Sequence, residues 1–452
     1  MNTVNRRQFI KATGGAAAVA ATTPRLAFSA DTYGDNILVF VFQRGGIDGL
    51  SFHVPMNGHP DRGNYEQLRS NGTMIPSNTL LPTTGGWGLH PAAGPLQDMW
   101  SDQSLAIVQA VGLLPYPNRS HFEAERYVEL GTPGNRFTTT GWLTRHMQTA
   151  SSLPSSLLLP AVVTESTIRL SLLRSPTAVS LRYPNNFDLD TGSSSYEEQQ
   201  EAALFDLYSQ NSNELDVAGA QALSAQNIIE SIPWNDYVPS NGATYPERLD
   251  SPGDITSFGY EMQIIAQLIK EDTGLRVAQT DFSGWDTHND QGNQLVTGQY
   301  YDQVRDLSEA LHAFFTDLDV PSPNGKTWAE RTTLMVYSEF GRRAFDNSDA
   351  GTDHGWGNNL LAMGGGVNGG QLYGDWPGLG EEELFQGADI WAQTDYRSVF
   401  SELLMKRYRN NQIWQIFPEF TEEQYKPHGV FNGSLVKPDF NDSERMFRDD
   451  FD

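Results

Sequence analysis

The chain has 452 residues, of which 56 are Asp or Glu and 30 are Lys or Arg, so its formal net charge is −26, and it contains no cysteine. A surface this acidic repels the phosphates of nucleic acids and of anionic lipids, so neither is an expected partner. The lack of cysteine excludes disulfides, thiolate metal sites and cysteine nucleophiles. With 38% hydrophobic and 11% aromatic residues, the composition is that of a globular protein.

Residues 1–30 have the pattern of an export signal. The paired Arg6 and Arg7 are followed by an apolar run of small residues at 12–21, and no acidic residue precedes Asp31. We therefore expect a twin-arginine signal peptide and a periplasmic or secreted protein. The apolar run is too short for a permanent membrane span, and we expect no integral membrane segment in the mature form. Cleavage removes four basic residues and no acidic one, which takes the net charge to −30.

The mature chain alternates strand-like and helical patterns, which predicts an α/β fold with a mostly parallel central sheet flanked by helices. Helices are expected from about residue 120, over 257–270 and over 294–318, where apolar residues recur at helical spacing. Short apolar runs of the kind buried in parallel sheets lie at 36–42, 105–111, 275–280, 332–337 and 359–363.

We expect residues 31–452 to form a single domain. Between residues 184 and 252 the composition shifts to Asp, Glu, Gln, Ser and Asn around one helix at about 196–232, which predicts a helical insertion on the sheet. The stretch 438–452 is acidic and is expected to be a surface tail.

Candidate metal ligands lie beside the ends of the predicted strands. Ligands of open parallel sheets bind beyond the carboxyl ends of the strands. Carboxylates with two imidazoles suit one or two divalent ions, such as Zn, Mn, Mg or Ca. Taken singly, each residue also fits a turn or an exposed loop, but their shared position favours a common site. The candidates are Asp48 after the first strand, Asp286 and His288 after the third, Glu339 after the fourth, and Asp353 and His354 before the fifth.

Ser120 is the candidate nucleophile. It lies at the start of the helix that is expected after the second strand. Ser120 and Glu123 have the spacing of a capping box, which by itself accounts for a serine there. A helix N-terminus also stabilises negative charge, and a nearby metal would lower the pKa of the hydroxyl. Three arginines beside the candidate acids either pair with them or hold an anionic substrate, namely Arg44, Arg119 and Arg342.

Several sequence blocks together resemble the bacterial exported family called domain of unknown function 1501, over nearly the whole mature chain. That family is grouped with the alkaline phosphatase and sulfatase superfamily, so the resemblance implies an alkaline-phosphatase-like fold. The blocks are RGGIDGL at 44–50, SHF at 120–122, GWL at 141–143, GWDTH at 284–288, SEFGR at 338–342, GTDHG at 351–355 and DYRSV at 395–399, besides the twin-arginine signal.

The superfamily pattern implies a role for individual residues. Where the pattern has an Asp-His pair at the end of a later strand, this chain has Glu339 and Phe340, and a phenylalanine cannot bind a metal. The chain has neither the cysteine that a formylglycine sulfatase converts nor the sequence motif that surrounds the equivalent serine. By resemblance, Asp48 matches a metal-binding Asp, Ser120 the nucleophile, Asp286 and His288 an Asp and His on one metal, and His354 the last His.

These observations lead to three hypotheses about function. The first is an exported metal-dependent hydrolase of phosphate or sulfate esters, acting on a small-molecule or polymer-borne anionic ester through Ser120. The second is a non-catalytic secreted binding or assembly protein that retains the fold, which Phe340 and the capping-box serine favour. The third is a metal-dependent transferase acting on envelope polymers.

Overall fold

The computed structural model describes residues 35–115, 117–154, 157–187, 196–209, 213–292, 298–434 and 436–440, all of which belong to one compact unit. The signal peptide expected at 1–30 lies outside the described residues, as does all but the start of the tail expected at 438–452.

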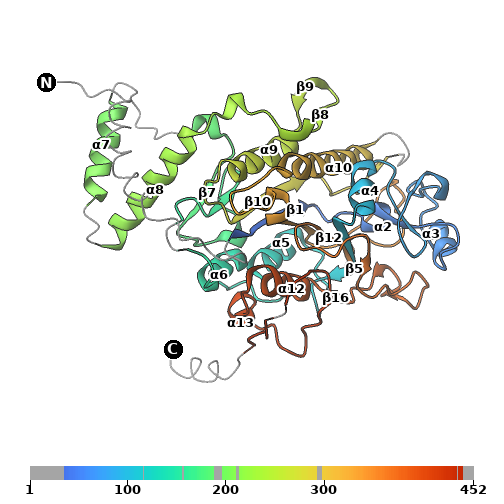
Figure 1. The fold of residues 1–452 in the computed structure, drawn as a ribbon. Helices are drawn as coiled ribbons and strands as arrows, with labels where there is room; N and C mark the ends of the chain where they lie inside the picture. The colour runs from blue at the N-terminus through green and yellow to red at the C-terminus, as the bar shows by residue number, and fades with distance from the viewer. Residues whose placement is uncertain are drawn as a thin grey trace. The chain divides into compact units, whose positions relative to one another are not determined.

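A nine-stranded sheet forms the centre of this unit (Figure 1). The central strand β1 is parallel to both of its neighbours, β10 and β11, and β10 continues in parallel through β6 to β7. Only β12 runs antiparallel to its two neighbours, β11 and β5, so the sheet is mixed but mostly parallel, and the predicted fold class is confirmed. The order is β13 (Leu372–Tyr373), β5 (Leu105–Gly112), β12 (Asn358–Gly364), β11 (Thr332–Ser338), β1 (Ile37–Arg44), β10 (Val277–Ser283), β6 (Ala161–Val163) and β7 (Ala178–Ser180), with β16 (Thr394–Asp395) also paired to β5.

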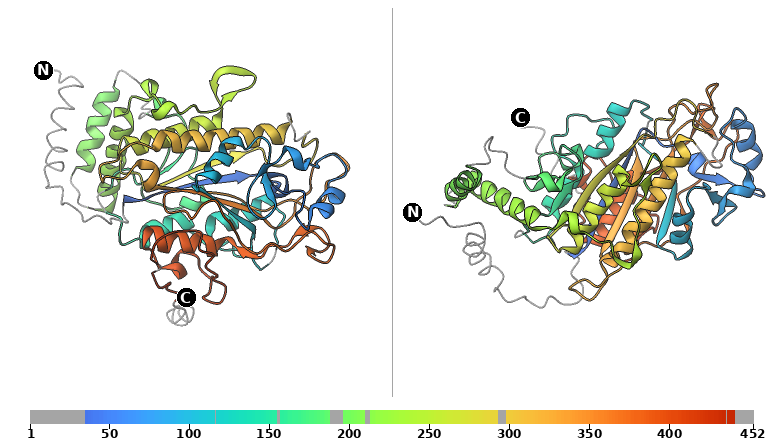
Figure 2. Two further views of the ribbon diagram at one scale, coloured as in Figure 1. Left: turned by 45° about the vertical axis from the view of Figure 1, so that its right-hand side comes forward. Right: turned by 90° about the horizontal axis from the view of Figure 1, so that it is seen from above.

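Alternate side chains of each strand enter two separate hydrophobic cores, as Figure 2 shows for the layers on either side of the sheet. In β1, Val39 and Val41 face one core, whereas Phe40 and Phe42 face the other. Because both faces are covered, the long strands are buried along most of their length, and β1 is apolar from Ile37 to Phe42. The first core packs against α4 (Gly94–Ser101), α9 (Ser257–Lys270), α10 (Gln299–Leu318) and α11 (Trp328–Arg331), and the second against α5 (His121–Leu130), α6 (Trp142–Thr149), α12 (Tyr396–Tyr408) and α13 (Ile413–Ile416).

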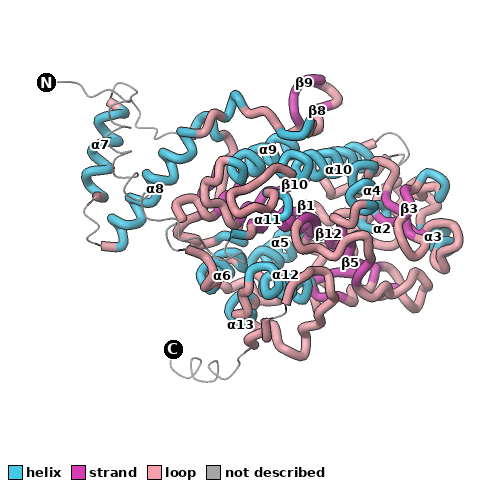
Figure 3. Tube along the Cα trace, viewed as in Figure 1, coloured by secondary structure: helices cyan, strands magenta, loops and turns pink. Residues whose placement is uncertain are grey.

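Smaller elements extend the sheet layers at one end (Figure 3). A third apolar cluster around Tyr65 and Trp87 supports them. They are α2 (Gly49–Phe52), β2 (His53–Pro55), α3 (Arg62–Leu68), β3 (Leu81–Pro82) and β4 (Trp87–Leu89), together with the hairpin of β14 (Leu384–Phe385) and β15 (Asp389–Ile390).

The insertion contains two helices, α7 (Glu197–Tyr208) and α8 (Glu214–Ser231), and a hairpin of β8 (Glu247–Arg248) and β9 (Ser251–Ile255), so the expectation of one helix over 196–232 was wrong. A new helix begins because the Asn213 side chain accepts bonds from the amides two and three residues further on.

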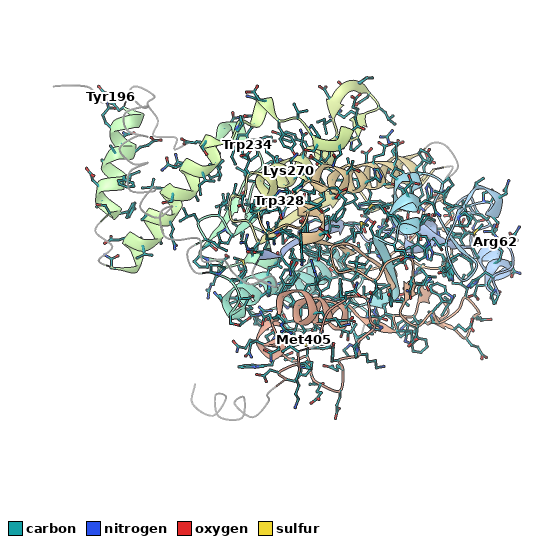
Figure 4. All side chains as sticks on the ribbon, viewed as in Figure 1. Arg62, Tyr196, Trp234, Lys270, Trp328 and Met405 are labelled. Atoms are coloured by element: carbon teal, nitrogen blue, oxygen red, sulfur yellow. The ribbon has the colours of Figure 1, made fainter. Side chains whose placement is uncertain are left out.

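Side chains at the base of the insertion fasten it to the sheet layers (Figure 4). Lys270 on α9 lies 2.6 Å from the Asp317 carboxylate of α10, which also accepts from the Tyr237 hydroxyl. Trp234 donates to the Ile229 carbonyl at 2.9 Å, and Ile229 is buried in the first core.

The antiparallel direction of β12 explains how the site is assembled. The chain leaves β11 at its carboxyl end, turns through residues 339–357 and enters β12 at the same edge of the sheet. An isolated bridge between Arg342 and His354 closes this turn. Residues before β12 therefore reach the edge where β1, β10 and β11 end.

In the described part of the chain, none of the helices combines the length and the apolar composition that a membrane crossing needs.

Candidate metal centre

Three histidines and one carboxylate converge at the carboxyl edge of the sheet. The Nε2 atom of His354 lies 2.9 Å from Nε2 of His121 and 2.8 Å from Nε2 of His288. All three Nε2 atoms lie 3.1–3.4 Å from Oδ1 of Asp286. The ligand atoms of His121, Asp286 and His354 lie mutually within 4.8 Å, and His288 contacts both Asp286 and His354. We call these four residues the imidazole cluster.

The outer nitrogen of every imidazole is held by an oxygen acceptor. His121 Nδ1 donates to the Glu339 carboxylate at 2.7 Å, His288 Nδ1 to Asp353 at 3.3 Å, and His354 Nδ1 to the backbone carbonyl of Arg119 at 2.8 Å. A neutral imidazole that donates from Nδ1 keeps its lone pair on Nε2. Three lone pairs and a carboxylate oxygen therefore face one another.

This donor arrangement fits a divalent cation. Lone pairs at such distances repel one another unless a cation or a proton lies between them. Metal-binding histidines almost always donate their second N–H to a carboxylate or a carbonyl, which fixes the ring and its tautomer. A tetrahedral ion with bonds of about 2.0–2.1 Å would separate its ligand nitrogens by about 3.3 Å, close to the spacings found here.

The β1 turn brings the strand ends together. Gly45 and Gly46 have φ angles of 118° and 66°. A Cβ on Gly45 would lie 2.5 Å from the Asp286 amide nitrogen, and a Cβ on Gly46 would lie 2.4 Å from the Phe340 ring. The Gly45 amide also donates to Glu339 at 2.8 Å. Glycine is required here because the backbone has a left-handed conformation and passes directly against two other strand ends.

Arg342, expected either to pair with an acid or to hold substrate, is buried beneath the cluster with no side-chain exposure and pairs with Asp286. Its guanidinium donates to the carbonyls of Gly45, Gly46 and Thr352 and lies 2.6 Å from Asp286. It therefore joins the ends of β1 and β10 to the turn before β12. Its place in the structure is that of a support for the Asp286 carboxylate.

Phe340 forms an apolar wall of the cluster. Its ring centroid lies 4.8 Å from that of His121 and 4.8 Å from that of His354. The position that the superfamily pattern gives to a histidine ligand is therefore occupied by a ring that packs two other histidines in place.

Asp48 lies in a different environment. Its carboxylate is buried and makes a two-pronged ion pair with Arg69, one contact being 2.8 Å, and it accepts from Ser51 at 2.6 Å and Gln291 at 2.9 Å. Among the described residues no hydrogen bond or ion pair joins Asp48 to the imidazole cluster. The structure thus brings together Asp286, His288 and His354 and leaves Asp48 outside them.

Glu339 and Asp353 support the cluster from behind. Glu339 is fully buried, and its two oxygens accept from His121, the Gly45 amide and the Ser338 hydroxyl. Asp353 accepts from His288 and from the Asn347 amide. Both residues, expected as ligands, accept hydrogen bonds from imidazoles of the cluster in this structure.

Ser120 precedes α5 but does not cap it. Its side chain makes no cap hydrogen bond. The Glu123 carboxylate accepts instead from the Asn118 side-chain amide, so the expected capping box was wrong. Ser120 is exposed, and its neighbours on both sides contact the cluster, His121 through its ring and Arg119 through its carbonyl. The hydroxyl is therefore unengaged by the helix at the rim of the cluster.

The two remaining arginines are paired. Arg119 forms an ion pair with Asp389, whose side chain is buried. Arg44 pairs with Asp281, Glu125 and Glu129.

A second group of possible ligands, His121, Glu125 and Glu339, adjoins the cluster. Burial, only partly offset by Arg44, raises the pKa of Glu125 to about 7. The Arg44 guanidinium, which is not itself a member of the group, forms an ion pair with Glu125.

Electrostatics favour a bound cation at Asp286 and His354 and oppose it at His121. Burial tends to raise the pKa of Asp286, but the hydrogen bond and charge of Arg342 outweigh it and lower the pKa to about 2. The hydrogen bond to Glu339 raises the pKa of His121 above its ordinary value, against the opposing effect of burial. Burial lowers the pKa of His354. At neutral pH, Asp286 is ionised and His354 is neutral, as metal binding requires.

Sequence reasoning missed His121 and Arg69. His121 stood within the SHF block and beside the candidate nucleophile, which was the available signal. Arg69 had no signal, because it lies 21 residues beyond Asp48, at the C-terminal end of α3, and shares no motif with it.

Comparisons with known protein families give one match to the body of the chain and one to its start. The model described as "Protein of unknown function (DUF1501)" matches residues 112–411, about two thirds of the chain. The chain belongs to the DUF1501 family. All four cluster residues lie in the DUF1501 match, whereas Asp48 and Arg69 precede it.

The second match concerns the signal. A twin-arginine translocation signal sequence matches residues 3–23, which confirms the expected export by this pathway to the periplasm or beyond. A comparison with curated proteins found no match.

Proposed function

We propose that this DUF1501 protein is an exported metal-dependent hydrolase of phosphate or sulfate esters, with Ser120 as the nucleophile. The observation that supports it most is the convergence of three Nε2 lone pairs on the Asp286 carboxylate, each imidazole being fixed by an acceptor at Nδ1. Three imidazoles and one carboxylate favour Zn²⁺ or a similar transition ion over Mg²⁺ or Ca²⁺, which prefer oxygen ligands.

The residues divide into ligands and supports. His121, His354 and Asp286 would hold the ion, with His288 beside them. Once bound, such an ion supplies a Lewis acid for the ester oxygens and lowers the pKa of a nearby hydroxyl. The side-chain exposures of 48% for Asp286 and 37% for His288 leave the site open to an ester from solvent.

Ser120 is the proposed attacking group, because it is exposed and directly precedes His121 of the cluster. Its Oγ would form a bond to phosphorus or sulfur as the ester oxygen leaves, and the hydroxyl proton would pass through solvent to the leaving oxygen. Water then cleaves the seryl ester. The N-terminus of α5, where Ser120 stands, favours the negative charge that develops.

The test combines metal analysis with a panel of aryl phosphates, phosphodiesters and aryl sulfates. Wild-type protein is expected to bind about one transition-metal ion and to hydrolyse at least one ester class. Ser120→Ala should retain the ion and lose turnover, whereas His354→Ala should lose both. Wild-type protein that remains metal-free and inactive after incubation with Zn²⁺ and Mn²⁺ would overturn the proposal.

An alkaline-phosphatase-like ancestry is part of this proposal. The mostly parallel sheet, the helix that starts at Ser120 and the ligands at the carboxyl edge support it. The Asp48 environment departs from the pattern, so we propose a one-ion site.

A second candidate is a secreted binding protein that keeps a structural ion. The Arg69 guanidinium on Asp48 favours it, because that carboxylate is then unavailable to a second ion. A metal-loaded protein that turns over none of the esters, with Ser120→Ala indistinguishable from wild type in every assay, would select this candidate. The transferase hypothesis predicts a product joined to an added acceptor alcohol.

A further inference from the structure

One cation beside the imidazole cluster is unpaired within the described part of the chain. It is Arg343, whose side chain makes no hydrogen bond or ion pair to any described residue, whereas Arg44, Arg119 and Arg342 are all paired with carboxylates. The Nε atom of Arg343 is nevertheless buried, and no described acceptor reaches it. Buried donors almost always have an acceptor, so this one requires an explanation.

The turn before β12 places Arg343 next to two carboxylates. Its amide donates to the Asp353 carbonyl at 2.9 Å, beside the isolated bridge that closes the turn, so the two residues face each other across antiparallel segments. Residues opposed in this way project their side chains from the same face. A second isolated bridge joins Arg343 to Asp389. The Arg343 side chain therefore leaves the backbone on the face that carries the Asp353 carboxylate.

The charge of Arg343 acts on both carboxylates without forming an ion pair with either. Burial tends to raise the pKa of Asp353, but hydrogen bonds and then the Arg343 charge lower it. Burial raises the pKa of Asp389, against the lowering effects of Arg119 and Arg343. The guanidinium carbon lies 5.5 Å from the centre of the Phe345 ring. A ring of this kind contacts the face of a guanidinium and leaves its in-plane N–H groups available.

Both carboxylates beside Arg343 are connected to the imidazole cluster. Asp353 accepts from the Nδ1 atom of His288, and Asp389 pairs with Arg119, whose backbone carbonyl holds a second imidazole. The Asp353 side chain is 43% exposed, so this flank of the cluster is open to solvent. Arg343 thus presents free N–H donors at the rim of the cluster, where a ligand can enter.

We infer that Arg343 holds the anionic oxygens of the ester at the cluster and so positions its phosphorus or sulfur atom; this inference rests on the proposed function. A guanidinium binds a tetrahedral oxyanion through two parallel N–H groups. The bound ester would supply the acceptors that Arg343 lacks in the described chain. The three arginines that the sequence suggested for this role are already engaged with carboxylates.

The acidity of the protein sets a condition on this binding. A mature chain with a charge of −30 opposes anions in general, and two carboxylates adjoin Arg343. One guanidinium does not outweigh these charges. We therefore expect Arg343 to bind an anion firmly only when a divalent ion occupies the imidazole cluster.

Titration calorimetry with two inert ester analogues tests the inference without turnover. Phenylphosphonate stands for a phosphate ester and benzenesulfonate for a sulfate ester. Zn²⁺-loaded wild-type protein is expected to bind at least one of them, which identifies the ester class. Arg343→Gln should weaken that binding at least about tenfold. Arg343→Lys, which keeps the charge but loses the planar pair of donors, should recover part of it. Arg248→Gln, which changes a 51% exposed arginine on the β8–β9 hairpin, is the matched control and should bind as wild type.

Further measurements separate the possible failures. Metal content and melting temperature should be unchanged in Arg343→Gln, so lost affinity would not reflect misfolding or an empty cluster. Unchanged analogue affinity in Arg343→Gln overturns the inference, as do loss of the metal in this variant, an equal loss of analogue affinity in Arg248→Gln, and wild-type protein that binds neither analogue. Equally strong binding by metal-free protein also overturns it, because the anion would then lie away from the cluster.

Kinetics distinguish this inference from the proposed function. If wild-type protein hydrolyses an aryl ester and Arg343→Gln has the same KM and kcat, the inference alone is overturned. If the analogues bind in an Arg343-dependent manner but no ester is hydrolysed, the proposed function is overturned and an oxyanion-binding site remains.

Discussion

Asp48 and Asp286 each follow a strand in the parallel part of the sheet, yet their surroundings differ. Asp48 is buried, and a guanidinium and two neutral donors satisfy it. Asp286 is about half exposed and faces three imidazole lone pairs. Both carboxyls have lowered pKa values: burial opposes the shift in each, and Arg69 overcomes it for Asp48 while Arg342 does so for Asp286. Position at a strand end provides a carboxylate, and its neighbours decide whether a guanidinium of the protein balances its charge, as at Asp48, or whether it faces lone pairs that could share a metal ion, as proposed for Asp286.

Removing the protein cation should have the largest effect. Arg69→Met leaves Asp48 charged and buried, so the free energy of unfolding should fall by about 3–5 kcal/mol. Urea denaturation measures this change, and Asp48→Asn/Arg69→Met should recover part of it. If Arg69→Met instead takes up an additional metal ion, the Asp48 site is a latent metal site and the distinction from Asp286 fails.

Breaking the imidazole cluster should remove the external cation. His354 Nε2 contacts both other imidazoles, so His354→Ala should weaken metal affinity more than about 100-fold, beyond the usual effect of an outer partner. Titration calorimetry with Zn²⁺ measures it, and His312→Ala on α10 is the matched control. Equal affinity in the two variants would contradict a metal centre at this position.

The support behind His121 should matter less. Glu339→Gln weakens the acceptor that holds Nδ1, so metal affinity should fall about 10–100-fold while the fold persists. The same titration measures it. An unchanged affinity would show that Glu339 serves only the β1 turn, through the Gly45 amide.

Metal affinity should depend on pH through His121. Glu339 raises the pKa of His121, and the protonated ring cannot bind, so affinity should fall about tenfold per unit as pH drops below that raised pKa. The contribution is complete at higher pH and is lost as pH falls. In Glu339→Gln the loss should begin at a lower pH, and identical profiles for the two proteins would refute this coupling.

Ser120→Ala should have the smallest effect on stability. Because its hydroxyl makes no cap bond, unfolding free energy should change by less than about 0.5 kcal/mol. Thr256, whose side chain accepts from the Gly259 amide at 3.1 Å, is the matched control and should cost about 1 kcal/mol on change to Ala. Equal losses for both variants would show that Ser120 does cap α5 in solution.

The five long strands β1, β5, β10, β11 and β12 were predictable because each is a long, largely apolar segment covered on both faces, whereas β6, β7, β13 and β16, of two or three residues each, were not predicted. The helix at 257–270 was predicted with its bounds, and that prediction is confirmed by α9. The direction of β12 was not predictable, because an antiparallel return leaves no mark in an apolar run. The break before α8 depends on an N-terminal cap by the Asn213 side chain. The surrounding residues are also polar, so Asn213 did not stand out as a cap in the sequence.

Prediction of the site was limited in the same way. The position of Asp286, His288 and His354 beside predicted strand ends indicated these three residues, and the fold brings them together. It could not show that Arg69 reaches Asp48, since that pairing depends on how the C-terminal end of α3 packs against the turn after β1. His121 was missed because the neighbouring Ser120 was interpreted as the reactive residue of this segment. In the structure it is the His121 imidazole that contacts the other members of the cluster.

The imidazole cluster combines segments up to 233 residues apart in the chain, from His121 to His354. A partly made or unfolded chain therefore has no such site. The twin-arginine pathway carries proteins that are already folded, so an ion bound at the proposed site would be acquired before translocation. The composition of the cytoplasmic metal pool, and the chaperones that control it, would then set which ion the protein carries, whatever metals are abundant where it finally resides.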